Sequence, residues 1–325
     1  MPREVRTVAV LGSGYMGGGI AQVFAAAGFT VQLADQSAEV AAAARDRLVA
    51  QSREFEAREL FASGAADAVD RHLHAADSVE EAAGQADLII EAVFEDVDVK
   101  SEVLERASAH ARPDTIIGTN TSTISVNTLR SAVTAPERFL TIHFFNPAPF
   151  VPGAEVVASE DTDEAVVEAV VRVLERAGKR PAVVGDTPGM VVNRIQYAMV
   201  SEAFRVVEEG VASMEAIDTL VRNSFGFRLG LVGPFSMVDQ AGVDVYAKCF
   251  GILRDAFGDR MAPPAALESA VAEGALGMKS GRGLLGEYDE DTRAAIQGYR
   301  DHAYVRMQGL QDDLGAPPSA GATQH

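Results

Sequence analysis

The sequence has a single cysteine, no long hydrophobic run and no cluster of Lys and Arg residues. Cys249 cannot form an internal disulfide, which fits a reducing compartment. A membrane-spanning helix needs about 20 mostly apolar residues, so we expect no transmembrane segment and no membrane partner. The net charge of −19 speaks against nucleic acid as a partner, because phosphate backbones attract clustered cations.

The chain of 325 residues is long enough for one large or two ordinary domains with ample core. Residues 1–6 lead directly into an apolar β-prone run, which leaves no room for a signal peptide. We therefore expect a globular protein of the cytoplasm. Its negative charge offers no general attraction for an anionic substrate, so local groups must hold any such substrate.

A glycine-rich turn follows the first predicted strand, residues 5–11, and precedes a helical run that ends at Gly28. A second strand, residues 30–34, is closed by Asp35. In a strand–turn–helix unit, such glycines allow a tight turn and close approach to a pyrophosphate, and the helix N-terminus attracts the phosphates. Glycines also make plain turns, but the flanking strand, helix and acid favour dinucleotide binding.

Asp35 selects between the two nicotinamide dinucleotides. A carboxylate at this place accepts hydrogen bonds from the ribose hydroxyls and repels a 2′-phosphate, so we expect NAD and not NADP. The residues expected to contact the cofactor here are Gly12, Gly14, Tyr15, Met16, Gly17, Asp35 and Gln36.

Residues 37–83 have a helical pattern with a break near Ser63-Gly64, which predicts an antiparallel helix pair projecting from the sheet. His72 and His74 lie two residues apart, so on a helix they point in different directions and we expect no metal site. Further strands are expected at 87–93, 115–119, 139–143, around Glu155 and at 180–184, with a helix at 164–177. The polar segment 120–123 lies either beside the nicotinamide half of the cofactor or at the start of the next helix, and both can hold together.

His143 follows a buried strand, at the sheet edge where ligands bind in open α/β folds. A proline-rich loop, residues 147–152, separates it from the extended run that begins at Glu155. An imidazole paired with a carboxylate removes a proton from a hydroxyl near neutral pH, because the carboxylate fixes the tautomer and stabilises the imidazolium. A buried structural histidine is the alternative reading of the same pattern.

Beyond Thr187-Pro188-Gly189 the pattern consists of helices alone, at 190–210, 214–224, 237–257 and 264–273. Asn193 lies in the first turn of the first helix, as a helix-start residue or a site residue. The basic loop 277–283 either cradles a phosphate or makes a turn. These patterns predict domains at 1–187 and 188–314, followed by a disordered tail at 315–325.

Several motifs resemble those of the short-chain 3-hydroxyacyl-CoA dehydrogenases: GSGYMGGGIAQVFA, DLIIEAVFED, NTSTIS, HFFNP and PGMVVNRIQYA. The resemblance covers nearly all of residues 5–290. It implies an α/β fold, namely a Rossmann-type doubly wound sheet with a projecting helix pair, followed by an all-helical C-terminal domain. It also implies NAD as cofactor, a role in fatty acid metabolism, and a homodimer formed through the helical domain.

By this resemblance His143 is the general base and Glu155 is its partner. The other implied site residues hold the substrate oxygen (Ser122, Asn193), position the dyad and the cofactor (Asn146), or contact the cofactor (Glu95, Lys100, Asn120).

Parts of the chain depart from the CoA-type members of the family. Residues 53–59 alternate Arg with Glu, where those members usually carry lysines for the CoA phosphates. The segments VPGAE, FGFRLGLVGPF and YRDHAYVRMQGLQD are more similar to the lambda-crystallin or L-gulonate 3-dehydrogenase branch, whose substrates are free hydroxy acids. Arg228 in the second segment matches a substrate carboxylate, or forms an ordinary ion pair.

We therefore expect an NAD-dependent oxidoreductase that interconverts an L-3-hydroxyacyl group, as a CoA thioester, and its 3-keto form. The alternatives are a dehydrogenase of a free 3-hydroxy acid of the gulonate or carnitine type, or of a carrier-protein-bound hydroxyacyl group. A non-catalytic, crystallin-like NAD-binding protein is a rival from another class. The joint presence of four polar site residues argues against it: His143, Glu155, Ser122 and Asn193.

Overall fold

A computed structural model describes residues 4–318 of the chain. Contacts divide the chain into two compact units, Met1–Val200 and Ser201–His325, which we call unit 1 and unit 2. Of the tail predicted to be disordered, residues 315–318 have no helix or strand, and residues 319–325 lie outside the described part.

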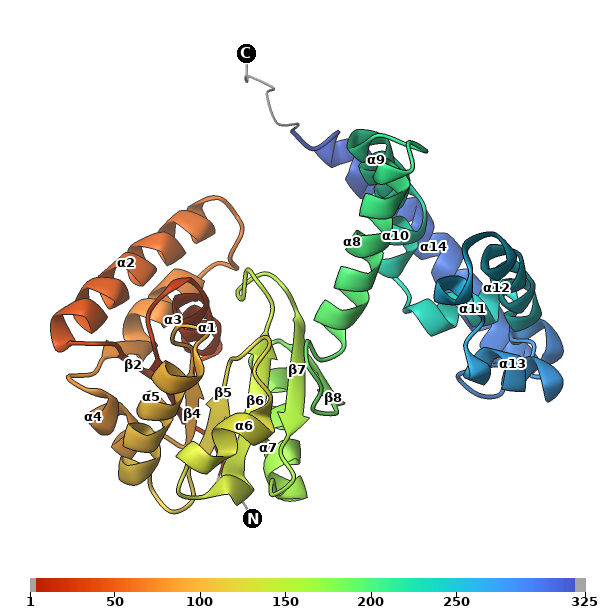
Figure 1. The fold of residues 1–325 in the computed structure, drawn as a ribbon. Coiled ribbons are helices and arrows are strands. Elements are labelled where there is room, and N and C mark those ends of the chain that lie inside the picture. Colours follow the sequence, from red (N-terminus) through yellow and green to blue (C-terminus); the bar gives the residue numbers. More distant parts are fainter. Residues whose placement is uncertain (1–3, 319–325) are drawn as a thin grey trace. The chain divides into compact units, whose positions relative to one another are not determined.

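Unit 1 is built on one sheet of eight strands in the order β3-β2-β1-β4-β5-β6-β7-β8 (Figure 1). Neighbouring strands are parallel except β6 and β7, which are antiparallel. The expected doubly wound sheet is therefore confirmed. The strands are β1 (Thr7–Leu11), β2 (Thr30–Ala34), β3 (Leu73–Ala75), β4 (Leu88–Glu91), β5 (Ile116–Thr119), β6 (Phe139–Phe144), β7 (Gly153–Ala158) and β8 (Arg180–Val184).

Helices cover both faces of this sheet, because alternate strand residues are apolar on both sides. Val8 and Val10 belong to one buried cluster, together with residues of α1 (Tyr15–Ala26), α2 (Ala38–Ala57), α3 (Ala65–His72) and α7 (Glu164–Arg176). Ala9 and Leu11 belong to the other cluster, with α4 (Val79–Gln85), α5 (Val97–His110) and α6 (Val126–Leu129).

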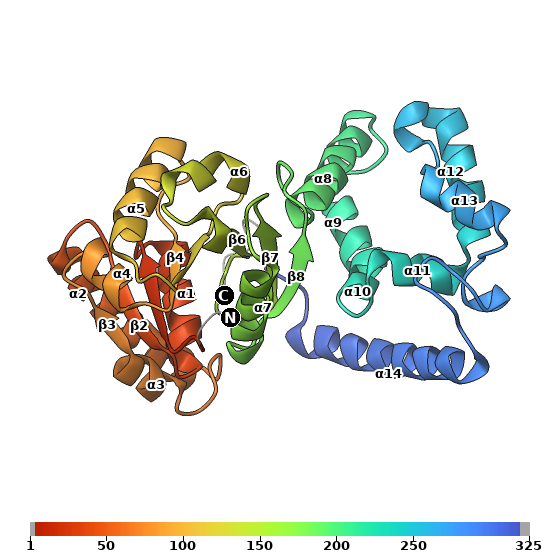
Figure 2. The ribbon, with the colours of Figure 1, turned by 90° about the horizontal axis from the view of Figure 1, so that it is seen from below.

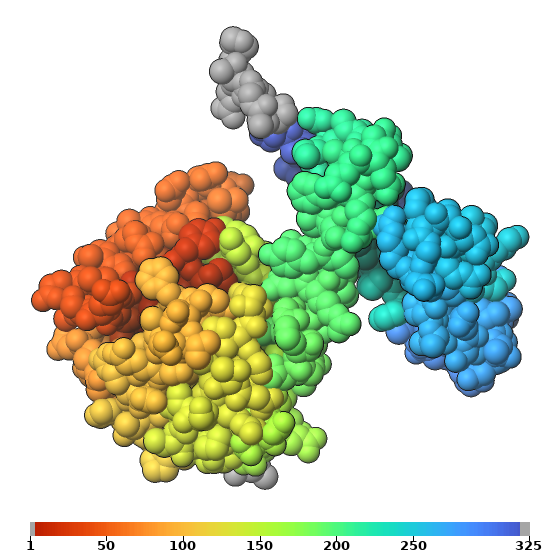
Figure 3. All heavy atoms as spheres, viewed as in Figure 1, coloured from red at the N-terminus to blue at the C-terminus, as the bar shows by residue number. Residues whose placement is uncertain are grey.

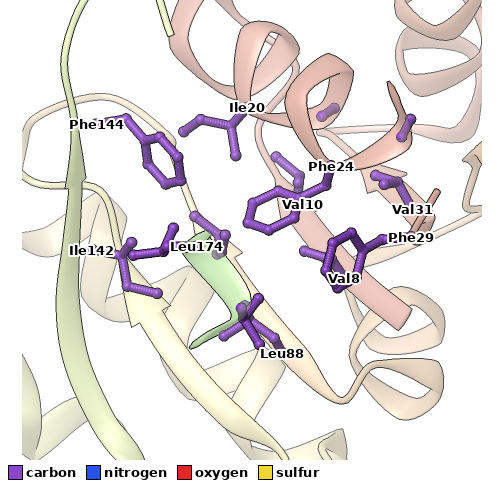
Figure 4. Packing of buried hydrophobic residues seen from close by; sticks show 14 of the residues in the cluster. Val8, Val10, Ile20, Phe24, Phe29, Val31, Leu88, Ile142, Phe144 and Leu174 are labelled. Atoms are coloured by element: carbon purple, nitrogen blue, oxygen red, sulfur yellow. The ribbon is translucent and has the colours of Figure 1, made fainter. Parts of the chain in front are cut away.

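Aromatic packing fixes α1 on the sheet. The Phe24 ring contacts those of Phe29 and Phe144 edge to face, with centroids 5.4 and 6.2 Å apart (Figure 4). All three side chains are buried. Because α1 begins at the glycine turn and Phe144 directly follows His143, this packing links the two halves of the predicted site.

The expectation that residues 37–83 form only a pair of helices is wrong in its second half. The break at Ser63-Gly64 is confirmed, but the edge strand β3 and the short helix α4 follow it. His74 consequently lies on a strand and not on a helix. Three residues are too few to show an alternating pattern, and that is why the strand was missed. No group of three or more metal-binding side chains occurs among residues 4–318.

Up to residue 318, the regular elements of unit 2 are helices, as expected. The helix α8 (Val192–Glu208) begins in unit 1, and the others are α9 (Met214–Asn223), α10 (Phe225–Leu229), α11 (Pro234–Ala241), α12 (Val243–Phe257), α13 (Ala265–Ala272) and α14 (Glu290–Leu314). Gly242, at φ +114°, divides the helix predicted at 237–257 into α11 and α12. Figure 2 shows α14 as one continuous helix, which its largely polar sequence did not reveal. None of the described helices is both long and apolar enough to cross a membrane.

The basic loop at 277–283 is a turn built around Asp239. This buried carboxylate accepts hydrogen bonds from the backbone N–H groups of Leu284 and Leu285 and from the Tyr288 hydroxyl. A Cβ atom at Gly283 would lie 2.3 Å from Asp239 Oδ1, so only glycine fits there. Of the two readings of this loop, the structure supports the turn.

Candidate active site

The glycine turn between β1 and α1 leaves an open surface for a ligand. Gly12 has φ +100°, and a Cβ atom there would lie 2.7 Å from the carbonyl oxygen of Ala92. A Cβ atom on Gly17 would lie 1.9 Å from the carbonyl oxygen of Gly12, whereas one on Gly14 would meet nothing within 4 Å. Gly12 and Gly17 therefore allow the tight turn, and Gly14 keeps the backbone accessible where α1 begins.

A cavity of about 620 Å³ opens beside this turn. In Figure 3 the N-terminal segments, coloured red, lie in a recess between orange and yellow segments of unit 1. The volume of the cavity is within the usual range for small-molecule sites. It is lined by Leu11, Gly12, Ser13, Gly14, Tyr15, Met16, Asp35, Gln36, Val79, Ala92, Val93, Phe94, Val99, Glu102, Val103 and Arg106.

Asp35 supplies a carboxylate to this cavity at the end of β2. Oδ2 accepts hydrogen bonds from the backbone and hydroxyl of Ser13, both at 2.6 Å, and Oδ1 accepts one from the backbone of Gln36 at 2.7 Å. Partial burial raises the pKa of the carboxyl, but these hydrogen bonds outweigh it and hold the pKa below its usual value. Asp35 is thus an anion, suited to ribose hydroxyls and unsuited to a 2′-phosphate.

The cavity offers little compensating positive charge. Arg106 is the one Lys or Arg among its lining residues, and its Nε donates to Glu80 Oε1 at 2.8 Å. Glu102 adds a second carboxylate to the lining. Glycine backbone, helix N-terminus and Asp35 together fit a dinucleotide with free ribose hydroxyls.

His143 and Glu155 face each other across the antiparallel pair β6 and β7, as directly paired residues of the register. His143 Nδ1 lies 2.8 Å from Glu155 Oε2, and both residues are buried. The Phe145 ring packs against the imidazole with centroids 4.8 Å apart. The predicted pair is therefore formed. The Glu155 carboxylate on one side and the Phe145 ring on another fix the orientation of the imidazole ring.

The second oxygen of Glu155 is also occupied. Oε1 accepts hydrogen bonds from the backbone N–H groups of Val191 and Val192, both at 2.9 Å, where α8 begins. These two contacts fix the carboxylate relative to the start of α8. Among residues 4–318, no group hydrogen-bonds the other imidazole nitrogen, Nε2 of His143.

Ser122, in the segment after β5, and Asn193, in helix α8, lie close to one another. Asn193 is the second residue of α8, and its side-chain amide donates to the carbonyl oxygen of Ser122 at 3.4 Å. Asn120 Oδ1 accepts the backbone N–H of Phe144 at 2.8 Å and so ties the end of β5 to the end of β6. Asn146 is exposed, and its bond to Pro147 is cis.

Glu95 and Lys100 belong to a network of charged side chains at the ends of β4 and β5. Lys100 is fully buried, and its Nζ donates to Glu91 Oε1 at 2.9 Å and lies 3.4 Å from Glu95 Oε2. Glu91 Oε2 accepts the Thr119 hydroxyl at 2.6 Å. Direct contact of Glu95, Lys100 or Asn120 with the cofactor stays a prediction.

Two side chains near the site were missed in the sequence. These are the buried side chains of Glu91 and Lys179. Lys179 Nζ donates to the carbonyl oxygens of Ala148 and Val151 in the proline-rich loop. Burial lowers the pKa of this ammonium. Charged residues that border apolar strand segments were the available signal for both.

Arg228 lies in α10 of unit 2. It lines a second cavity, of about 390 Å³, with Met237, Gln240, Ala241, Arg300, Asp301 and Tyr304. Within residues 4–318 it forms no ion pair. Its recognition of a substrate carboxylate stays a prediction.

The sheet, the glycine turn and the acid after β2 define a nicotinamide dinucleotide-dependent dehydrogenase. Comparison with protein-family models gives the family: residues 7–187 match the NAD-binding domain and residues 189–287 the C-terminal domain of 3-hydroxyacyl-CoA dehydrogenase. The chain belongs to this family.

Individual relatives agree with the family match. The mitochondrial hydroxyacyl-coenzyme A dehydrogenase of Sus scrofa is 36% identical over 288 residues, which is 86% of this chain and 90% of the relative. A crystal structure of a 3-hydroxyacyl-CoA dehydrogenase from Archaeoglobus fulgidus superimposes with a TM-score of 0.76 at 29% identity, over 94% of this chain and 99% of the other.

A third relative has a different name. The 5-formyl-3-hydroxy-2-methylpyridine 4-carboxylate 5-dehydrogenase of Mesorhizobium japonicum is 32% identical over 308 residues, or 94% of this chain and 98% of the relative. These comparisons confirm the expected family and the α/β fold with a helical second part. They also confirm the oxidoreductase class and the cofactor NAD.

Proposed function

We propose that the protein interconverts an L-3-hydroxyacyl-CoA thioester and its 3-keto form, with His143 and Glu155 as the general-base pair. The observation that carries the proposal is the 2.8 Å contact between His143 Nδ1 and Glu155 Oε2 at the end of the sheet that binds the dinucleotide. This reaction places the protein in fatty acid metabolism.

His143 removes the hydroxyl proton. His143 Nδ1–H donates a hydrogen bond to Glu155, so the neutral imidazole carries its lone pair on Nε2, where the substrate hydroxyl donates. The imidazolium that forms is stabilised by the Glu155 carboxylate, whose other oxygen is held by the backbone N–H groups of Val191 and Val192. In the reverse direction His143 returns the proton to the alkoxide.

Ser122 and Asn193 orient the substrate oxygen toward His143. The Asn193 amide contacts the backbone carbonyl of Ser122, so the start of α8 lies beside the segment that follows β5. Bound NAD supplies the hydride chemistry at the carbon that bears this oxygen. The chain itself supplies binding, orientation and proton transfer. Asn146 completes the site by positioning the dyad and the cofactor.

The experiment is a substrate panel followed by NADH absorbance. L-3-hydroxyacyl-CoA thioesters of several chain lengths, carrier-protein-bound hydroxyacyl groups and free 3-hydroxy acids are each supplied with NAD. We expect the CoA thioesters to give the highest kcat/KM. Turnover of no hydroxy compound, with NAD still bound, would support the non-catalytic crystallin-like alternative.

A second candidate is oxidation of a small free carboxylate. Arg47 of the projecting helix α2 donates to the carbonyl oxygen of Ser13. Three other arginines of this region are in ion pairs: Arg45 and Arg53 both contact Asp70, and Arg58, directly after α2, contacts Glu54. These carboxylates compete with any phosphate group for the guanidinium donors. The relative from Mesorhizobium japonicum, named for a pyridine carboxylate, also matches this chain over 94% of its length. In the panel, this candidate predicts that free acids exceed thioesters in kcat/KM.

We also propose that the protein is a cytoplasmic homodimer formed through unit 2. Large apolar side chains are exposed on its helices, with Leu220 at 64%, Val305 at 74% and Leu314 at 75% relative exposure. Such surfaces are typical of protein interfaces. Light scattering should give twice the chain mass of 34.3 kDa, and a monomer at micromolar concentration would contradict the proposal.

A further inference from the structure

The carboxylate of Glu95 binds three consecutive residues of the segment that carries Ser122. Its Oε1 accepts hydrogen bonds from the Thr121 hydroxyl at 2.7 Å, from the Ser122 backbone at 2.8 Å and from the Thr123 backbone at 2.9 Å. The Thr123 hydroxyl donates to the same oxygen at 3.1 Å. Glu95 comes from the turn after β4, so one side chain from a neighbouring element holds the whole segment.

The other oxygen of Glu95 faces a buried cation. Lys100 Nζ lies 3.4 Å from Glu95 Oε2 and also contacts Glu91, which binds Thr119 at the end of β5. A continuous chain of charge-assisted contacts therefore runs from the rigid strand ends of the sheet to the segment 121–123. Such contacts are stronger than those between neutral groups.

We propose that Glu95 is a positioning residue that acts on catalysis through Ser122. This inference rests on the proposed function, in which the Ser122 hydroxyl holds the substrate oxygen. Without the carboxylate, the backbone N–H groups of Ser122 and Thr123 lose their acceptor, and the segment is free to move away from the geometry that His143 needs. Displacement of a positioning group by about 1 Å is enough to slow an enzymatic reaction severely.

This role differs from a direct contact between Glu95 and the cofactor. If Glu95 contacts the cofactor directly, removing the Glu95 carboxylate weakens NAD binding whether or not Ser122 has its hydroxyl. A positioning role makes the loss of Glu95 matter only while Ser122 has a hydroxyl to position. The two roles therefore separate in a double-mutant cycle.

The test compares wild type, Glu95→Ala, Ser122→Ala and the double variant. We expect Glu95→Ala to lower kcat by about tenfold or more, with the Kd of NAD changed less than about threefold. In the Ser122→Ala background, the same substitution should change kcat by less than about threefold. An equal loss in both backgrounds, or a rise in the Kd of NAD that matches the loss, would overturn the proposal.

Glu95→Gln keeps the shape of the side chain and one acceptor oxygen, so it should retain more activity than Glu95→Ala. Glu105→Gln removes the same charge from an exposed position of α5 and serves as the matched control. Hydrogen exchange of the Ser122 and Thr123 amides adds a readout that needs no substrate. Exchange should accelerate by about tenfold or more in Glu95→Ala, and not in Glu105→Gln.

These readouts also separate the two proposals. Failure of the proposed function appears as absence of hydroxyacyl turnover in the wild-type protein. Failure of the positioning role appears as an active wild type whose Glu95→Ala variant keeps wild-type kcat, or as unchanged amide exchange in that variant.

Discussion

At the scale of the residue, hydrogen bonds fix the orientation of three carboxylates near the candidate site. Glu155, Asp35 and Glu95 each use both oxygens, and each binds donors from two different segments of the chain. Of the three, Glu155 is buried, and a buried carboxylate is tolerated only when such partners are present. The partners also fix the direction in which the carboxylate acts on its neighbours.

We expect Asp35 to determine the choice of cofactor. We predict that kcat/KM with NAD exceeds that with NADP by about tenfold or more, because the carboxylate repels the additional phosphate. Asp35→Ser should narrow this ratio, since it removes the charge at the same place. Steady-state kinetics with both cofactors check the prediction, and equal efficiencies in the wild type would contradict it.

The pairing of His143 with Glu155 could be predicted from the sequence because both residues border predicted strands joined by a short loop. The sequence did not show that Glu155 also binds the start of α8, since that contact joins positions 36 and 37 residues apart. The role of Glu95 in holding residues 121–123 was missed for the same reason. Contacts between loops that are distant in sequence leave no periodic pattern.

At the scale of the element, the ends of β4 and β5 depend on one buried lysine. Lys100 has no exposed side-chain surface and bridges Glu91 and Glu95. Removing one partner of a buried ion pair leaves the other charge uncompensated. The stability of the sheet at the carboxyl ends of β4 and β5 and the conformational order of residues 121–123 should therefore be linked.

We predict that Lys100→Met lowers the free energy of unfolding by about 3–5 kcal/mol, the usual effect of breaking a buried ion pair. Urea unfolding monitored by circular dichroism measures the change. Lys248→Met, at an exposed position of α12, is the control and should change stability by less than about 0.5 kcal/mol. Equal effects of both substitutions would show that the Lys100 contacts contribute nothing to stability.

Element prediction succeeded where hydrophobic periodicity was long and strong. The strand at 30–34 and the helix α7 were placed within a residue of their observed bounds. Prediction failed for β3, which has three residues, and for α14, whose exposed surface is mostly polar and which has no buried residue. Short strands and polar helices depend on tertiary contacts that local sequence does not display.

At the scale of the whole molecule, the two units differ in how well the sequence explained them. In unit 1 the fold, the cofactor and the His143–Glu155 pair could all be predicted. For unit 2 the helical class was predicted, but the role of a single residue such as Arg228 in substrate choice stays a prediction. A guanidinium recognises a carboxylate or balances a nearby acid with the same geometry, so sequence alone cannot separate the two.

Arg228→Met distinguishes these roles. If Arg228 recognises a substrate carboxylate, we predict that the substitution raises the KM for free hydroxy acids by about tenfold or more, the effect of losing one charge-assisted pair. The KM for CoA thioesters should stay nearly constant. Steady-state kinetics with both substrate classes provide the measurement, and a parallel response of both classes would make Arg228 a structural residue.

The central claim is that His143, held by Glu155, removes the hydroxyl proton of the substrate, with the hydride chemistry left to bound NAD. The most direct measurement is the turnover of His143→Ala and Glu155→Gln with an L-3-hydroxyacyl-CoA thioester, followed by NADH absorbance with substrate deuterated at C3 as a check that chemistry limits the rate. We predict a loss of about 10²–10⁴-fold for His143→Ala, a smaller loss for Glu155→Gln, and little change in NAD affinity. If His143→Ala kept more than about a tenth of wild-type turnover with chemistry limiting, the dyad would have no place in the mechanism.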